Sequence, residues 1–166
     1  AAAGDVRHAL DAADFPEPFD TEKKLEKFLT PEEALRKLDL PQGFQATLCA
    51  AEPEVRNPIA MTWDARGRLW VAECFTYGEN AFDLSLRDRI LIFEDTDGDG
   101  RFDMRKVFTD ELQQLTGIEV GLGGVWVAAS PRLLFIADAN GDDIPDGAPV
   151  THLEGFRVPP ESYHNL

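Results

Sequence analysis

Short runs of alternating apolar and polar residues dominate the chain from residue 44 onward. This period of two is typical of half-buried β-strands. Residues 59–63 and 68–72 flank the turn 64–67, and this arrangement predicts a β-hairpin with Gly67 where positive φ is tolerated. Further strands are expected at residues 44–48, 89–94, 102–108, 117–122, 125–129 and 133–137, with Gly123-Gly124 as a two-residue turn.

Residues 1–43 lack this alternation and are expected to form an N-terminal arm with a short α-helix. Thr30 is placed to cap the helix, Pro31 suits its first position, and Glu33 completes a capping box. A preceding helical stretch is expected at residues 22–28. The sequence therefore predicts a helical arm of 1–43 followed by an all-β domain.

An internal repeat favours one all-β architecture. The strand 69–72 (Leu-Trp-Val-Ala) recurs as 125–128 (Val-Trp-Val-Ala), and the acidic loop that begins at Asp95 recurs at Asp138. Each unit has four expected strands in roughly 40–45 residues, which is the period of a β-propeller blade. Residues 44–166 are therefore predicted to hold two four-stranded blades and the start of the next. Because a blade buries its faces only against neighbouring blades, we expect the propeller to continue beyond this chain.

The chain is strongly acidic, with 31 Asp and Glu residues against 16 Lys and Arg residues and a formal net charge of −15. Such a surface repels phosphate backbones and anionic lipids, which argues against nucleic-acid binding and peripheral membrane binding. The same charge attracts divalent cations. No apolar run reaches the about 18–20 residues that a membrane-spanning helix requires, so no transmembrane segment is expected in this chain.

Two acidic loops are the clearest candidates for metal chemistry. The first, residues 95–103, has carboxylates at relative positions 1, 3, 5 and 9 and a carbonyl at position 7, as in the first part of an EF-hand-like calcium loop. The second, residues 138–146, keeps this spacing but has Asp143 where the first has Gly100. The expected calcium ligands are Asp95, Asp97, Asp99, the Arg101 carbonyl and Asp103 in the first loop, and Asp138, Asn140, Asp142, the Ile144 carbonyl and Asp146 in the second.

A polar hairpin turn is the alternative interpretation of each loop, because Asp-Gly and Asn-Gly form turns without any metal. The bidentate Glu of a complete EF-hand loop is also missing from the first loop, since Lys106 stands at its position. Four clustered carboxylates nevertheless repel one another without a cation, and a turn requires only one of them. This repulsion favours calcium.

Other reactive residues give weaker signals. Cys49 and Cys74 have no C-x-x-C spacing, which excludes a zinc ribbon or a covalent haem attachment within this chain. A disulfide between them and two buried free thiols both remain open. On strand positions, Trp63, Trp70 and Trp126 are expected in the core, whereas Arg87, Asp88 and Arg89 are expected to form surface ion pairs.

Several segments together carry a resemblance to a known family. They are residues 50–53 (Ala-Ala-Glu-Pro), 68–73 (Arg-Leu-Trp-Val-Ala-Glu), 93–100 (Phe-Glu-Asp-Thr-Asp-Gly-Asp-Gly) and 163–165 (Tyr-His-Asn), with a fitting lead-in at 30–44. From residue 48 to the end, the chain resembles the N-terminal propeller of the bacterial membrane-bound dehydrogenase family, also named PVC-type haem-binding CxxCH proteins. The resemblance covers roughly three quarters of the chain.

This resemblance implies an exported, periplasmic protein with a propeller similar to soluble quinoprotein glucose and sorbosone dehydrogenases. The implied activity is oxidation of a sugar or an alcohol by a PQQ-like quinone, with electrons passed to a haem c elsewhere in the full protein or in a cytochrome c partner. His164 is the position that matches the general base of those propellers. Asn165-Leu166 depart from the small residues of that motif, and the quinone ligands would come from later blades.

Two further functions fit the same residues. The chain is interpreted alternatively as part of a non-catalytic, calcium-braced propeller that binds carbohydrate or a protein, or as part of a scaffold subunit in a cytochrome assembly. In each case the remainder of its own propeller or another chain is the expected partner of the open blades. Fold-level analogy alone does not decide among these functions.

Overall fold

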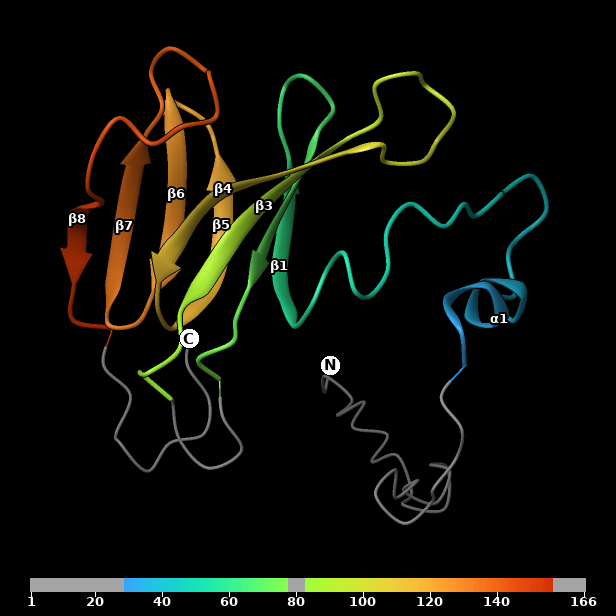
Figure 1. Cartoon of the computed structure of the whole chain (residues 1–166), viewed down its shortest axis with the longest axis horizontal. Coiled ribbons are helices and arrows are strands. Elements are labelled where there is room, and N and C mark those ends of the chain that lie inside the picture. Colours follow the sequence, from blue (N-terminus) through green and yellow to red (C-terminus); the bar gives the residue numbers. More distant parts are fainter. Residues whose placement is uncertain (1–28, 78–82, 157–166) are drawn as a thin grey trace, which may run out of the picture.

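A computed structural model describes residues 29–77 and 83–156, and nearly all of the regular structure in them is β-sheet (Figure 1). One helix in this part of the chain, α1 (Pro31–Arg36), precedes all of the strands. The strands are β1 (Pro58–Trp63), β2 (Leu69–Glu73), β3 (Asp88–Glu94), β4 (Met104–Leu112), β5 (Leu115–Val120), β6 (Gly124–Ala129), β7 (Arg132–Ala137) and β8 (Val150–Glu154).

The helix α1 begins as its sequence predicts. The Thr30 hydroxyl accepts a hydrogen bond from the Glu33 amide at 3.2 Å, and the Glu33 carboxylate accepts one from the Thr30 amide at 2.8 Å. This reciprocal pair is the predicted capping box. The helix ends after six residues, at Arg36, and buries none of them, so it adds little to the core. The helical stretch expected at 22–28 lies outside the described residues.

The strands form two antiparallel sheets, each of four strands in the order in which the chain supplies them, β1-β2-β3-β4 and β5-β6-β7-β8. The prediction of an all-β fold is confirmed at this level. The two sheets stand side by side and do not close into a barrel, with β5 lying next to β1 and β2 (Figure 1). The β1–β2, β3–β4 and β7–β8 connections lie together at one end of the sheets.

The strand expected at 44–48 is wrong. These residues form no strand, and the Phe44 side chain is 72% exposed. The Phe44 amide instead donates to the Pro41 carbonyl in a turn. Alternation of apolar and polar residues is not enough for a strand, because backbone groups also need a neighbouring strand with which to pair.

The turn between β5 and β6 lies one residue earlier than expected. Leu122 and Gly123 both have positive φ, at 57° and 79°, and Gly121 donates to the Gly124 carbonyl across them. This combination is the geometry of a type I′ hairpin turn, whose twist matches that of the flanking strands. Gly124 is consequently the first residue of β6 rather than part of the turn.

A single apolar core fills the space between the two sheets. One face of the first sheet contributes Trp70, Ile90, Ile92 and Phe108, and the second sheet contributes Leu115, Val125, Val127, Leu134 and Ile136. The Trp70 and Phe108 rings meet edge to face with centroids 5.1 Å apart. Aromatic pairs of this kind add stability beyond the area that they bury.

The opposite face of the first sheet is covered by the chain that precedes β1 and by Phe102 of the β3–β4 loop. Leu69, Val71, Leu91 and Phe93 are buried there, packed against Ala50, Val55 and Phe102. This cover does not extend over β1, where Met61 is 70% exposed and Trp63 is 58% exposed. The expectation that all three tryptophans lie in the core therefore holds for Trp70, is wrong for Trp63, and is met only in part by the half-buried Trp126.

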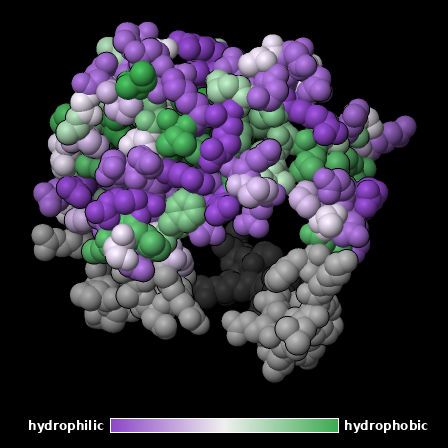
Figure 2. Space-filling view, in the orientation of Figure 1, coloured by the Kyte–Doolittle hydropathy of each residue, from purple (hydrophilic) through white to green (hydrophobic). Residues whose placement is uncertain are grey.

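The described surface is mostly hydrophilic in this orientation, with separate hydrophobic patches between the polar residues (Figure 2). The predominance of polar residues agrees with the acidic composition of the chain. Within residues 29–77 and 83–156, no helix has the length and apolar character that a membrane crossing requires.

The close packing around Gly124 gives a first prediction. A Cβ at this position would lie 2.7 Å from Phe135 Cζ and closer still to the Ile136 carbonyl oxygen. Gly124→Ala should therefore lower the free energy of unfolding by about 1–3 kcal/mol, the usual cost of overpacking. Urea denaturation would measure the change. Gly121→Ala is the matched control, since a Cβ there meets no atom within 4 Å, and an equal loss in both variants would contradict the account.

Candidate metal centre

The first acidic loop connects β3 to β4 and brings three of its predicted ligands together. One carboxylate oxygen from each of Asp95, Asp97 and Asp99 lies within 4.8 Å of the others. Asp95 is half-buried, whereas Asp97 and Asp99 are exposed to solvent. The three side chains therefore form a small anionic cup that opens to the outside of the molecule.

Backbone amides hold this cup in shape. The Asp95 carboxylate accepts hydrogen bonds from the amides of Gly98 at 2.7 Å and Gly100 at 2.8 Å. The Gly100 amide is the main reason that the pKa of Asp95 lies below its usual value, with the Gly98 and Asp99 amides adding to the effect. Gly98 and Gly100 have φ of 76° and 86°, which side-chain-bearing residues rarely adopt. The carboxylate is thus ionised near neutral pH and held in place by the loop backbone.

The Asp103 side chain lies outside the cluster of three carboxylates. The Asp103 carboxylate accepts hydrogen bonds from the Thr96 amide at 3.1 Å and the Thr96 hydroxyl at 2.6 Å, which closes the base of the loop. The Arg101 amide donates to Asp99 at 2.8 Å. The structure therefore brings together the predicted ligands at positions 1, 3 and 5, and it does not bring Asp103 into the same cluster.

The second acidic loop, between β7 and β8, has the same outline but a different interior. Asp146 accepts from the Ala139 amide at 2.8 Å, as Asp103 does with Thr96. The Asn140 side-chain amide donates to the Asp142 carboxylate at 2.9 Å. This contact places a hydrogen-bond donor among the side chains that would have to coordinate a cation. The Ile144 amide donates to Asp142 at 2.9 Å, which is the counterpart of the Arg101 contact.

Basic residues of the first sheet hold the turn of the second loop. Arg68 Nη1 lies 2.8 Å from Asp143 Oδ2, and Arg66 Nη2 donates to the Gly141 carbonyl at 3.2 Å. Lys106 donates to the Asp142 carbonyl at 2.7 Å and lies 3.6 Å from Asp143. Asp143 stands where the first loop has Gly100, and this difference has a structural consequence. The Asp143 carboxylate joins the two sheets. Neither the spacing nor the composition of the loop had indicated this contact.

Arg68 is the centre of this contact and is buried, with 5% of its surface exposed. Its Nε donates to Asp64 Oδ2 at 2.8 Å, and the same oxygen accepts from Trp70 Nε1 at 3.0 Å. The other Asp64 oxygen accepts from the backbone amides of Arg66 and Arg68, each at 2.9 Å. A carboxylate in the β1–β2 turn therefore fixes the guanidinium that reaches across to Asp143.

The charges in this network stabilise one another. Burial raises the pKa of Asp64 and of Asp143, but hydrogen bonds and the positive charge of Arg68 outweigh it, so both pKa values lie below the ordinary value for Asp. The hydrogen bond to Asp143 raises the pKa of Arg68. All three groups are ionised near neutral pH, and the pair between the sheets is at full strength there.

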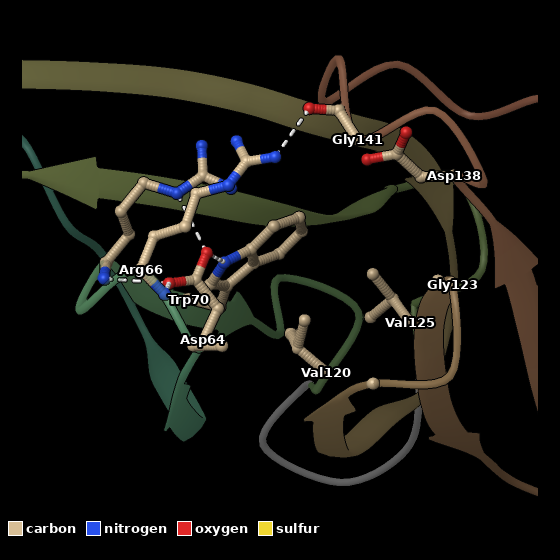
Figure 3. Close-up of a pocket in the computed structure, with 12 residues that line it drawn as sticks. Asp64, Arg66, Trp70, Val120, Gly123, Val125, Asp138 and Gly141 are labelled. Atoms are coloured by element: carbon tan, nitrogen blue, oxygen red, sulfur yellow. Dashed lines mark hydrogen bonds and ion pairs between the residues drawn. The ribbon is translucent and has the colours of Figure 1, made fainter.

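A pocket of about 220 Å³ lies beside this network, between the β1–β2 turn, the β5–β6 turn and the second acidic loop (Figure 3). Its lining includes Asp64, Arg66, Trp70, Val120 and Gly123. Figure 3 shows Arg66 extending over the pocket toward Gly141. The Trp70 indole is 2% exposed, so it offers no open stacking surface to a ligand.

Two buried carboxylates lie at the opposite ends of β2 and β3 from the acidic loops. Asp88 is fully buried and accepts hydrogen bonds from the Thr76 amide at 2.8 Å, the Thr76 hydroxyl at 2.8 Å and the Leu115 amide at 2.9 Å. Glu73 is also fully buried and pairs with Arg89. The expectation of a surface ion pair at Asp88 is therefore wrong, because this carboxylate ties the first sheet to the start of β5.

The two cysteines are free, with Cys49 exposed and Cys74 buried. Burial raises the pKa of the Cys74 thiol, which lies 3.6 Å from Asp88. Of the two open alternatives, the disulfide is absent and Cys74 is the buried thiol. His164, the predicted general base, lies outside the described residues.

One protein family matches residues 30–161, and its description is "Domain of unknown function (DUF7133)". The match spans α1, both sheets and both acidic loops. No curated protein and no solved structure matches the chain at a significant level.

The Arg68–Asp143 pair leads to a prediction on the pH dependence of stability. Asp143→Asn keeps the side-chain shape and tolerates the positive φ of 65°, but removes the charge that faces Arg68. At about pH 7, we expect the free energy of unfolding to fall by about 1.5–3 kcal/mol. The folded-state pKa of Asp143 is lowered, so its contribution is complete above the unfolded value of about 3.9 and is lost as pH falls through the folded-state pKa.

Urea denaturation at a series of pH values would measure this difference. The gap between the native protein and Asp143→Asn should narrow below about pH 4. Asp110→Asn, an exposed carboxylate on β4, is the matched control and should change stability little. A stability difference between the native protein and Asp143→Asn that stays constant as the carboxylates protonate would contradict the Arg68–Asp143 pair. An equal loss of stability in Asp110→Asn would contradict it as well.

Proposed function

The chain belongs to the family described as Domain of unknown function (DUF7133), and on this premise we propose that it is a calcium-binding β-sheet module. The first acidic loop is the binding site, and calcium braces the β3–β4 hairpin. The observation that carries the proposal is the convergence of Asp95, Asp97 and Asp99 within 4.8 Å of one another.

The donor set in the first loop fits calcium better than other common metals. Calcium takes six to eight hard oxygen ligands in flexible geometry, and carboxylates are its usual protein ligands. Zinc prefers His nitrogen and Cys sulfur, neither of which occurs in this loop. The three carboxylates would supply the charge, and the Arg101 carbonyl, Asp103 and water are the predicted sources of the remaining oxygens.

Among the described residues, the three carboxylates also lack a Lys or Arg partner. Within residues 29–77 and 83–156, the ion pairs of Lys and Arg involve Asp64, Glu73 and Asp143. Asp95, Asp97 and Asp99 are left to repel one another at close range. A divalent cation would remove this repulsion. The second loop is the weaker candidate, because Arg68 and Lys106 already neutralise its turn.

The calcium site belongs to a propeller-type arrangement in this proposal, with the two sheets as neighbouring blades. Each sheet has four antiparallel strands in chain order, and the first strands of the two sheets, β1 and β5, are neighbours. Propeller blades have this strand order and share this contact between first strands. The repeated acidic loop then occupies the same β3–β4 and β7–β8 position in both blades.

The calcium-braced module agrees with the non-catalytic function expected as an alternative. The exported dehydrogenase that the family resemblance implies remains a further proposal. Its general base, His164, lies outside the described residues, and its quinone and haem ligands would lie on other parts of a full protein. No described residue favours the oxidation of a sugar over the binding of one.

Calcium should raise the melting temperature of chelator-treated protein, because a ligand that binds only the native state stabilises it by mass action. At a calcium concentration about 100 times the Kd, the gain is about 2.7 kcal/mol, or about 5–10 °C for a domain of this size. Differential scanning calorimetry would measure the shift, and titration calorimetry the stoichiometry. Asp97→Asn should abolish most of the shift.

The matched control is again Asp110→Asn, which removes one exposed negative charge without touching the loop. This variant should keep the full calcium effect. A shift that survives in Asp97→Asn, or that disappears equally in both variants, would show that calcium acts through the general negative charge. No shift in the native protein would contradict the proposed function.

A further inference from the structure

The face of the second sheet that points away from the first carries an aromatic cluster. The Trp126 ring lies 4.8 Å from both the Phe135 and the His152 ring, measured between centroids, in tilted contacts. Along β6, Val125 and Val127 are buried in the core between the sheets, so Trp126 faces the other side. Trp126 and Phe135 are half-buried and His152 is exposed.

Each member of this cluster has a counterpart in the buried contact between the two sheets. The sequence repeat relates Trp126 to Trp70. Strand pairing extends the relation, because Phe135 is the β7 partner of Trp126 just as Ile92 is the β3 partner of Trp70. The open face of the second sheet therefore corresponds to the face with which the first sheet contacts the second.

The ring contacts of the two faces also correspond. Phe108 on the fourth strand of the first sheet packs on Trp70, with centroids 5.1 Å apart, and His152 on the fourth strand of the second sheet packs on Trp126 at 4.8 Å. The first pair is buried, with Trp70 at 2% exposure and Phe108 at 4%. The second pair has the same arrangement and no cover in the described structure.

The existing contact shows what kind of surface covers such a face. Trp70 and Phe108 are covered by aliphatic side chains of the neighbouring sheet, namely Leu115, Ile118, Val120, Val125, Val127, Leu134 and Ile136. Thr62 adds a polar contact, since its hydroxyl lies 3.3 Å from Glu119 of the second sheet. Glu119 is also the counterpart of Thr62 in the repeat. Thr62 pairs with Trp70 in the first sheet, and Glu119 pairs with Trp126 in the second.

We infer that the Trp126 face is the docking surface for a further four-stranded antiparallel sheet with an aliphatic face and a hydrogen-bond donor opposite Glu119. The further sheet would pack on the second sheet in the same way as the second sheet packs on the first. This inference rests on the blade arrangement proposed above, and it adds the surface and the chemistry of its partner.

A second copy of the chain does not offer this aliphatic face. The corresponding face of the first sheet, around Val71 and Leu91, is covered by Ala50, Val55 and Phe102. The corresponding face of the second sheet is buried in the core. The partner is therefore a separate sheet whose aliphatic face is free.

The probe for this inference is the full chain followed by a second copy of residues 113–156 that carries Glu119→Thr, which supplies another sheet with the aliphatic face and a hydroxyl donor opposite the resident Glu119. Trp63→Phe in the full chain and Trp126→Phe in the appended copy leave Trp70 and the resident Trp126 as the fluorophores. Trp70 is buried, so acrylamide quenching reports on Trp126. In the extended protein, quenching should fall to that of the unextended chain with both Trp63→Phe and Trp126→Phe, in which only the buried Trp70 remains. Unchanged quenching would overturn the inference.

A pair of variants on β8 tests the face itself. His152→Glu places a charge in the docking surface and should restore quenching in the extended protein, whereas Thr151→Glu, on the next residue and the other face of the strand, should not. Equal behaviour of the two variants would contradict the assignment. If the unextended chain self-associates and His152→Glu abolishes this association, the face binds a second copy of the chain. That result would also overturn the inference.

The experiment also separates this inference from the proposed calcium site. Neither acidic loop contributes to the Trp126 cluster, so the quenching result should be the same in calcium and in chelator. A failed calcium shift with intact docking would contradict the proposed function alone. An intact calcium shift with exposed Trp126 would contradict only the docking surface.

Discussion

The buried guanidinium of Arg68 joins the β1–β2 turn of the first sheet to the second acidic loop. It binds Asp64 in the β1–β2 turn and Asp143 in the second loop, and its Cζ lies 5.7 Å from the centroid of the Trp70 ring. A buried charge without partners is costly, so the guanidinium requires both carboxylates. The first sheet can keep this side chain buried only if the second sheet packs against it, which makes sheet contact and loop geometry interdependent.

The two acidic loops share one sequence pattern but differ in the surroundings of their negative charge. In the second loop, an Asp at the sixth position reaches a protein cation, and an Asn amide donates to a neighbouring carboxylate. The first loop has Gly100 at the sixth position and gathers three carboxylates without a Lys or Arg partner among the described residues. Among the described residues, the first loop is therefore the place where three carboxylates converge without a basic side chain.

Much of the fold was predictable from local sequence, because β-strands in a two-sided sheet alternate and tight turns need particular residues. Those rules identified the β1–β2 hairpin, the helix cap at Thr30 and the loop carboxylates. They failed where a long-range partner decides the outcome. Residues 44–48 alternate but have no strand to pair with, and Asp88 is buried because amides from distant segments converge on it. Asp143 likewise found its partner on the other sheet.

The central claim is that the first acidic loop holds a calcium ion on Asp95, Asp97 and Asp99. The most direct test is diffraction from crystals of the protein grown with calcium, compared with crystals grown with chelator. The account predicts an ion in the first loop with six to eight oxygen ligands at about 2.3–2.6 Å, including all three carboxylates. An empty first loop at saturating calcium, or an ion bound only in the second loop, would contradict it.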